Sequence, residues 1–242
     1  YVDLRQTPAA GSLTQYLASA GFSPDVLEDR DQRCESRNEG ACTFRDCDVG
    51  SSVPDRVSAG EVTITGGTED ITLIFPETDT NSSYYDTGFG RIFDGSHTLS
   101  IAAEGDEVPA FSAQLQPPSG GTLTAPTLPP SGEKLTVDTS SDLAVEWTTD
   151  DIDRGDFYLS LSSGDSSGST SIDCTWDATS GSESVPASLL ADMGPEHGSY
   201  EFMIGDSETR IAGDFRIDIR AVDDIGDGDD STSDGAGSAT FE

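Results

Sequence analysis

From residue 57 onward, apolar and polar residues alternate with a period of two, and this alternation constrains the fold more than any other feature. Successive side chains of a β-strand point to opposite faces, so the pattern is typical of strands with one buried face. Clusters of Gly, Ser and Asp separate the runs at short intervals, which favours a β-sandwich. The runs are EVTITGG, ITLIF, HTLSIAAEG, FSAQL, KLTVD, LAVEWT, DFYLSLSSG, SIDCTW, YEFMIG, FRIDIRAVDD and GSATFE. The sequence therefore predicts an all-β protein.

A proline-rich segment at residues 117–132, PPSGGTLTAPTLPPSG, divides these runs into two groups. Proline lacks the N–H that a central strand needs, so the segment is predicted to be a linker. On either side of it the sequence repeats loosely, since GEVTITGGTEDITLIF from Gly60 aligns with GEKLTVDTSSDLAVEW from Gly132. This internal similarity indicates two tandem sandwiches of related build. We predict a first β-sandwich at 37–125 and a second at 126–242.

Residues 1–36 differ from the rest and are predicted to form an N-terminal arm with a short helix. The helix is expected at 12–21, where Ser12 can act as N-cap and Gly21 as a stop. Between them, apolar residues recur at helical spacing. They are Leu13, Tyr16, Leu17 and Ala20.

The segment before this helix, YVDLRQTP, alternates like a strand. As an unanchored terminus it would be disordered. As an assembly arm, Tyr1, Val2 and Leu4 would add to the edge of a neighbour's sheet. Docking on another copy would favour assembly, whereas an arm packed on its own molecule would count against it.

The charge of the chain excludes some classes of partner. Twelve Lys and Arg residues stand against 46 Asp and Glu, a formal charge of −34. Such a chain repels phosphate backbones and anionic lipids, so we expect no nucleic-acid or membrane-surface binding. Because salt screens self-repulsion, the composition favours a protein that works in brine or seawater, with a calcium-loaded extracellular module as the alternative. No apolar run reaches the length of about 18 residues that a membrane-spanning helix needs.

Four cysteines predict two disulfides in an oxidising compartment, and hence an extracellular or cell-surface protein. A zinc site would need paired cysteine spacings or nearby histidines, and His97 and His197 are isolated. Four cysteines allow three pairings. We favour a Cys34–Cys42 disulfide, which closes a short loop, and a Cys47–Cys174 disulfide, which closes a long one. The cysteines are Cys34, Cys42, Cys47 and Cys174.

The stretch DDIGDGDDSTSDG, residues 223–235, holds six aspartates in thirteen positions. Calcium binds six to eight oxygens, which alternating Asp and Gly can supply, although the spacing is not that of an EF-hand. A second acidic turn with Asp150, Asp151 and Asp153 can face the same end of the sandwich. The composition favours a solvated acidic loop, with calcium as its rival and no other cofactor expected. The candidate ligands are Asp223, Asp224, Asp227, Asp229, Asp230 and Asp234.

Motifs that imitate catalytic sites lack their partners, so we predict no enzyme. GDSSG at 164–168 is similar to the nucleophile loop of chymotrypsin-like proteases, but neither His97 nor His197 lies in a matching motif. RGD at 154–156 is predicted to be a tight turn. The dense aromatic cluster of Tyr84, Tyr85, Phe89 and Phe93 is either a ligand-binding patch or core.

Two resemblances sharpen the expected fold and location. Trp147 in LAVEWT on an early strand, with FRIDIRAVDD as a late strand, resembles the immunoglobulin-like or fibronectin type III plan, without the antibody cysteines. SAGEVTITGG, HTLSIAAEGDEVPAFSAQL, DLAVEWT and SIDCTWDATSGSESVPASLLADM resemble uncharacterised secreted or lipid-anchored β-sandwich proteins of gliding, predatory bacteria, over roughly residues 57–220. The resemblance implies two tandem immunoglobulin-like β-sandwiches, a secreted or cell-surface location associated with an outer membrane, and no established activity.

These features together predict a secreted or cell-surface structural protein without catalytic activity, a subunit of a fibre, appendage or surface layer. Its expected partner is another copy of itself or another surface protein. The alternative is an extracellular adhesion module that binds glycan or protein, with or without calcium, through loops at one end of a sandwich.

Overall fold

The computed structural model describes residues 1–9, 13–23, 34–48, 56–76, 83–130, 133–150, 154–164, 168–194, 198–225 and 237–242. In these residues the regular elements are strands, apart from one short helix, α2 (Ala187–Leu190), and a 3-10 turn at Ala178–Ser180. The prediction of an all-β protein is confirmed. Neither helical element of this described part is long and apolar enough to cross a membrane.

The largest sheet has eleven strands and runs through the whole molecule in the order β3-β4-β14-β13-β16-β17-β1-β2-β7, with β11 and β18 attached beside β16. We call it the long sheet. Its strands are β1 (Val2–Ala9), β2 (Leu13–Ala20), β3 (Cys34–Glu39), β4 (Cys42–Asp48), β7 (Tyr84–Phe89), β11 (Leu135–Val137), β13 (Asp156–Gly164), β14 (Gly168–Asp177), β16 (Gly198–Ala212), β17 (Phe215–Asp224) and β18 (Gly237–Phe241).

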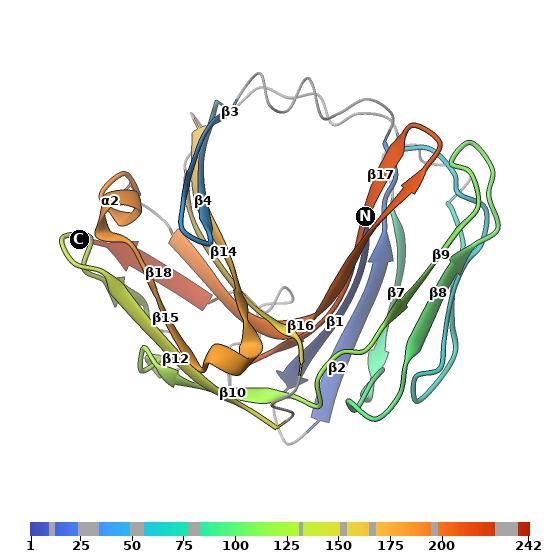
Figure 1. Cartoon of the computed structure of the whole chain (residues 1–242), viewed down its shortest axis with the longest axis horizontal. Coiled ribbons are helices and arrows are strands. Elements are labelled where there is room, and N and C mark those ends of the chain that lie inside the picture. Colours follow the sequence, from blue (N-terminus) through green and yellow to red (C-terminus); the bar gives the residue numbers. More distant parts are fainter. Residues whose placement is uncertain are drawn as a thin grey trace.

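Two smaller sheets pack on the long sheet. One has the order β6-β5-β8-β9, and the other β10-β12-β15. Figure 1 shows the long sheet bent like the letter U, with both small sheets on its outer side, one on each limb. Their strands are β5 (Val62–Thr65), β6 (Ile71–Leu73), β8 (Leu99–Ala103), β9 (Phe111–Leu115), β10 (Gly121–Ala125), β12 (Leu143–Thr149) and β15 (Ser182–Val185).

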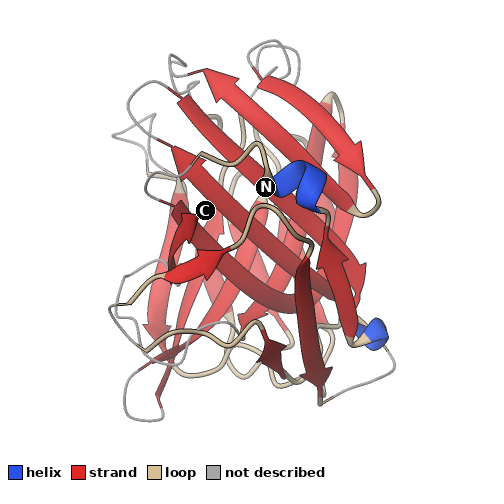
Figure 2. Ribbon diagram, turned by 90° about the vertical axis from the view of Figure 1, so that its left-hand side faces the viewer, coloured by secondary structure: helices blue, strands red, loops and turns tan. Residues whose placement is uncertain are grey.

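Each small sheet closes one hydrophobic core against the long sheet. The first core joins Val2 and Leu4 of β1 to Ile64 of β5 and its neighbours. In the second core, Trp147 of β12 stacks on Phe157 of β13 with ring centroids 3.9 Å apart. The molecule is therefore two sandwiches that share one sheet (Figure 1). Figure 2 turns the molecule by 90° and shows that strands dominate its described part.

The long hairpin of β16 and β17 makes the shared sheet continuous. β16 places Phe202 in the second core and Ala212 in the first, and its pairing with β17 runs from Met203 to Ala212. The predicted linker at 117–132 contains β10, which pairs with β12, so the linker prediction is wrong for that part. Backbone hydrogen bonds of one sheet, rather than a proline-rich spacer, connect the two halves.

The predicted helix at 12–21 is wrong. Residues Leu13–Ala20 form β2, which pairs antiparallel with β1 on one side and with β7 on the other. Tyr16, Ala18 and Ala20 are buried, while Leu17 remains exposed, so the burial has the period of a strand. Pairing with two neighbours outweighs the local helical spacing.

The predicted free arm is also wrong. β1 lies between β17 and β2, pairing parallel with the first and antiparallel with the second. Val2 and Leu4 have no exposed surface, and only Tyr1 of the three arm residues is exposed, at 42%. Because both edges of β1 are used inside this molecule, the segment cannot join a neighbour's sheet without leaving its own.

The cores do not follow the predicted limits of 1–36, 37–125 and 126–242. β4 pairs with β14, and its Cys42 and Phe44 lie in the second core. β1 and β2 complete the first core. Strand pairing between distant segments decides which core each segment joins. A linear division of the chain cannot represent such pairing.

All four cysteines form disulfides, as predicted, but the favoured pairing is wrong. The bonds are Cys34–Cys47 and Cys42–Cys174. Each joins residues that face one another across a ladder, Cys34 with Cys47 between β3 and β4 and Cys42 with Cys174 between β4 and β14. The second bond fixes the β3-β4 hairpin to the second sandwich.

Candidate functional site

The candidate site lies on the face of the long sheet that is turned away from both small sheets. On β1, Val2 and Leu4 enter the core, so Asp3 and Arg5 point to the opposite face. On β17 the same alternation puts Arg220 on that face, because Ile219 and Ala221 are in the core. This surface, which we call the inner face, is the concave side of the U in Figure 1.

Arginines of this very acidic chain gather on the inner face. The strand alternation places four of the nine described arginines there, Arg5, Arg45, Arg216 and Arg220. Each is paired with carboxylates, and Arg220 donates from Nε and Nη2 to the two oxygens of Asp3, both at 2.9 Å. Arg45 binds Asp173 and Arg216 binds Asp218. The inner face therefore presents neutralised pairs of donors and acceptors rather than free positive charge.

The arginine at the centre of the face is largely buried. Arg5 binds Glu201 at 3.0 Å and Asp224 at 3.1 Å, and the side chain of Asp224 is only 1% exposed. Burial alone would lower the pKa of Arg5, but the two carboxylates raise it above its usual value, so Arg5 stays charged. This cluster ties β1, β16 and β17 together, and it explains why Asp224 is not exposed to solvent.

A row of side chains crosses five strands of the inner face, one residue from each. In the strand register, Tyr85 of β7 lies opposite Ser19 of β2, which lies opposite Asp3 of β1. Asp3 in turn lies opposite Arg220 of β17, and Arg220 opposite Ser207 of β16. We call these five residues the central row. Since neighbouring strands lie about 4.8 Å apart, the row extends for about 19 Å. Along the row lies a depression of about 580 Å³, whose lining includes Asp3, Arg220 and Ser207.

Exposed apolar side chains are concentrated on the same face. Five large hydrophobic residues of the described chain are exposed, and four of them are on the inner face. Strand alternation places Leu17, Tyr85 and Ile211 there, and Tyr1 lines the depression together with Asp3 and Arg220. Tyr85 is 73% exposed, whereas its neighbour Tyr84 is fully buried. Clustered exposed apolar groups among polar ones are typical of binding surfaces.

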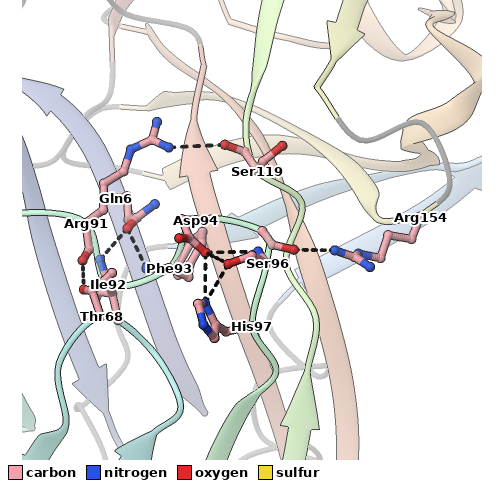
Figure 3. A network of polar contacts seen from close by, with 11 residues as sticks. Gln6, Thr68, Arg91, Ile92, Phe93, Asp94, Ser96, His97, Ser119 and Arg154 are labelled. Atoms are coloured by element: carbon pink, nitrogen blue, oxygen red, sulfur yellow. Dashed lines mark hydrogen bonds and ion pairs between the residues drawn. The ribbon is translucent and has the colours of Figure 1, made fainter.

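A second polar network joins the two sandwiches at their junction (Figure 3). Gln6, buried in β1, accepts hydrogen bonds from the N–H groups of Ile92 and Phe93 at 2.5 and 3.0 Å. Arg91 in the same loop donates to the carbonyl of Ser119 at 3.3 Å. Arg154 donates to the carbonyl of Gly95 at 2.5 Å. Residues before β10 and β13 thus hold a loop of the first sandwich.

Asp223 lies at this junction with a strongly perturbed acidity. Burial raises the pKa of Asp223, Arg91 lowers it, and the charges of Asp224 and Asp150 raise it, which together bring the pKa to about 7. The nearest Arg91 nitrogen is 3.7 Å from the carboxylate. At neutral pH this side chain is therefore close to its titration point.

The two described candidates for calcium, Asp223 and Asp224, do not converge. They are successive residues of β17, so their side chains point to opposite faces of the sheet, Asp224 toward Arg5 and Asp223 toward Arg91. The residues that the structure describes contain no group of three or more His, Cys, Asp or Glu side chains that could hold a metal ion. The remaining candidates, Asp151, Asp153, Asp227, Asp229, Asp230 and Asp234, lie outside the described residues.

His97 takes part in a local turn that superficially resembles a catalytic triad. Its Nδ1 is 2.7 Å from Ser96 Oγ and 3.2 Å from Asp94 Oδ1. A catalytic histidine contacts serine and aspartate through different ring nitrogens, whereas here one nitrogen faces both. Hydrogen bonds from Ser96 lower the pKa of Asp94 to about 2, so the carboxylate organises the turn. His197 and the centre of GDSSG lie outside the described residues.

The other motifs have structural roles. In the aromatic cluster, Tyr84 and Phe93 are buried in the first core, and Tyr85 is exposed. The side chain of Phe89 lies outside the described residues. In RGD, Arg154 is bound to Gly95 and Gly155 has a φ of 101°, which glycine adopts readily, immediately before β13. The cluster and the tripeptide are therefore not separate sites.

Sequence reasoning missed the central row, because its members come from residues 3 to 220 and meet only through strand pairing. One signal was present. YVDLRQ and FRIDIR both place charged residues between apolar ones, with the order Asp–Arg in one and Arg–Asp–Arg in the other. Two such strands can pair charges across a ladder once their adjacency is known.

Comparisons with known proteins give no family. No family model matches the chain, and no curated protein matches it. Among solved structures, the fibronectin(III)-like modules of Clostridium thermocellum CbhA are 15% identical with a TM-score of 0.20, over 78% of this chain and 87% of theirs. A structure from a study of host cell surface retention of a 1.5-MDa bacterial ice-binding adhesin is 16% identical with a TM-score of 0.20. That match covers 91% of this chain and 63% of the adhesin chain.

Proposed function

We propose that this protein is a secreted or cell-surface binding module of the adhesion type, without catalytic activity, and that its inner face is the binding surface. One observation carries the proposal. Four of the five exposed large hydrophobic side chains of the described residues lie on the inner face, together with four paired arginines. The outer face of the same sheet is covered by the two small sheets and supplies the cores.

Two further features support a location outside the cell and a binding role. Two disulfides are typical of proteins in oxidising compartments. The inner face is also rigid, because backbone ladders and the Arg5 cluster hold its side chains in place. Rigid surfaces lose little conformational entropy on binding, which favours specific recognition.

An array experiment tests the proposal. Purified protein in molar-range salt is applied to immobilised neutral, acidic and basic glycans and to cationic and anionic peptides. A Ser207→Trp variant places a large side chain on an exposed position of the inner face, and Ser184→Trp does the same on an exposed position of β15 as a control. We expect the wild type and Ser184→Trp to retain a ligand that Ser207→Trp loses. Equal retention by all three proteins, or none by any, would overturn the proposal.

A further inference from the structure

We propose that the ligand of the inner face is a neutral polysaccharide chain that lies along the central row, across the strands; this inference rests on the binding function proposed above. The central row consists of Tyr85, Ser19, Asp3, Arg220 and Ser207, in that spatial order. It offers an exposed aromatic ring at one end, an ion pair in the middle and hydroxyl groups on both sides of that pair.

The charges of the face favour a neutral ligand. A formal charge of −34 repels polyanions such as acidic polysaccharides. A cationic ligand would need carboxylates that are not already neutralised, but in the row Asp3 is held at both oxygens by Arg220. The row therefore has no unbalanced charge with which to attract an ion of either sign.

Arg220 and Asp3 can still form hydrogen bonds with hydroxyl groups of a ligand. Arg220 uses Nε and Nη2 to bind Asp3, which leaves Nη1 as a donor. Each carboxylate oxygen of Asp3 accepts one of these bonds and has a second lone pair. The side chain of Arg220 is 40% exposed, so a ligand can reach it. Vicinal hydroxyl groups of a sugar can both accept from the guanidinium and donate to the carboxylate.

The apolar contacts fit the carbon-bound face of a sugar ring. Tyr85 is 73% exposed at the β7 end of the row. Tyr1 lies beside the row at the rim of the depression, with the Arg56 guanidinium 5.6 Å from its ring centroid and its amino group donating to Gly21 at 2.7 Å. Tyrosine combines an apolar ring with a polar hydroxyl and loses little entropy when it binds.

The shape of the site fits a linear chain better than a second copy of the protein. A row of about 19 Å with one side chain per strand matches an extended oligomer of small units. Two copies would bury about 800 Å² each in a stable dimer, and each carries the charge of −34 into that contact. A neutral chain meets no such repulsion.

Titration calorimetry tests the inference with defined probes. The full chain in molar-range salt is titrated with cellohexaose, maltohexaose, xylohexaose and mannohexaose, and with hexagalacturonate and hexalysine as charged probes. We expect binding by a neutral hexasaccharide and by neither charged probe. Tyr85→Ala should weaken that binding about five- to tenfold, the loss of one aromatic contact, and Ser207→Trp should abolish it.

Two variants outside the inner face serve as controls. Ile74→Ala removes the one exposed large apolar side chain of the described residues outside the inner face, and Ser184→Trp matches the blocking variant; both should bind within about twofold of wild type. Circular dichroism verifies the fold of every variant. Hexalysine or hexagalacturonate binding that Ser207→Trp blocks would overturn the ligand class and keep the binding function. Neutral binding that Ser207→Trp leaves unchanged, or the absence of any ligand here and on the array, would overturn both.

Discussion

Replacing Asp223 by asparagine should stabilise the protein at pH 8 and leave it nearly unchanged at pH 4. The carboxyl is buried at the junction of the two sandwiches, and burial raises its pKa from 3.8 to about 7. A carboxyl with a raised folded pKa is protonated in both states below pH 4. Between pH 4 and pH 7 only the unfolded state releases its proton, so stability falls as pH rises through this window.

The magnitude follows from the shift. One pKa unit corresponds to 1.36 kcal/mol, so a difference of about three units makes the ionised carboxylate cost about 4 kcal/mol above pH 7. Asparagine has a similar shape and no charge, and it removes this cost. The shift already includes the attraction of Arg91, so the loss of that ion pair needs no separate correction.

Urea denaturation in molar-range salt with EDTA, at pH 4, 5, 6, 7 and 8, measures the effect. The free energy of unfolding of Asp223→Asn should exceed that of wild type by a margin that grows from pH 4 to pH 7 and then stays constant. Asp218→Asn is the control on the same strand. Burial raises the pKa of Asp218, but hydrogen bonds from Thr209 and Arg216 outweigh it and lower the pKa, so this variant should be slightly less stable than wild type at pH 8.

The reasoning would be refuted by a constant difference across the pH series. Destabilisation of Asp223→Asn at pH 8 would mean that the ion pair with Arg91 outweighs the cost of burial. In that case Asp223 is ionised across the pH series, and its charge stabilises the junction instead of destabilising it.

Three further predictions follow from the same structure. Replacing Cys42 and Cys174 by serine opens a loop with a sequence separation of 132 and should cost about 5 kcal/mol in the chain-entropy model, against about 3 kcal/mol for Cys34 and Cys47; urea denaturation of each double variant tests the order. Gln6→Ala leaves two buried N–H groups without their acceptor and should lower the free energy of unfolding by about 3 kcal/mol. Gln114→Ala, at an exposed position, should leave it unchanged. Light scattering should give the monomer mass of 25.4 kDa, and removal of residues 1–8 should unfold the protein; a larger mass that this deletion abolishes would contradict the closed position of β1.

Strands with long alternating runs could be predicted from the sequence almost to the residue. FRIDIRAVDD is β17 and DFYLSLSSG is β13, because most of their large apolar residues alternate with polar ones. β2 could not be predicted in this way. Its buried residues include Ala18 and Ala20, whose small side chains give a weak signal, while exposed Leu17 adds a false one. The neighbours β1 and β7 decide the conformation, and neither adjacency is visible in a single sequence.

Pairing between distant segments is what a single sequence does not reveal. The four cysteines correctly indicated two disulfides, but the choice of partners depends on the registers of β3 with β4 and of β4 with β14. The aspartates at 223 and 224 looked equivalent as calcium ligands. Their opposite directions depend on a strand that continues through both residues. In each case the residue types indicated the kind of interaction, but strand pairing decides which side chains meet.

The shared sheet also explains why we place the ligand on the inner face rather than on loops at the end of a sandwich. Two sandwiches joined by a flexible linker would lose entropy whenever a ligand fixed their relative position. Here β16 contributes to both cores and pairs with β17, which contributes to the first, and backbone hydrogen bonds set the spacing of Ser207, Arg220 and Asp3. The central row is therefore arranged before a ligand arrives, and binding energy is not spent on ordering it.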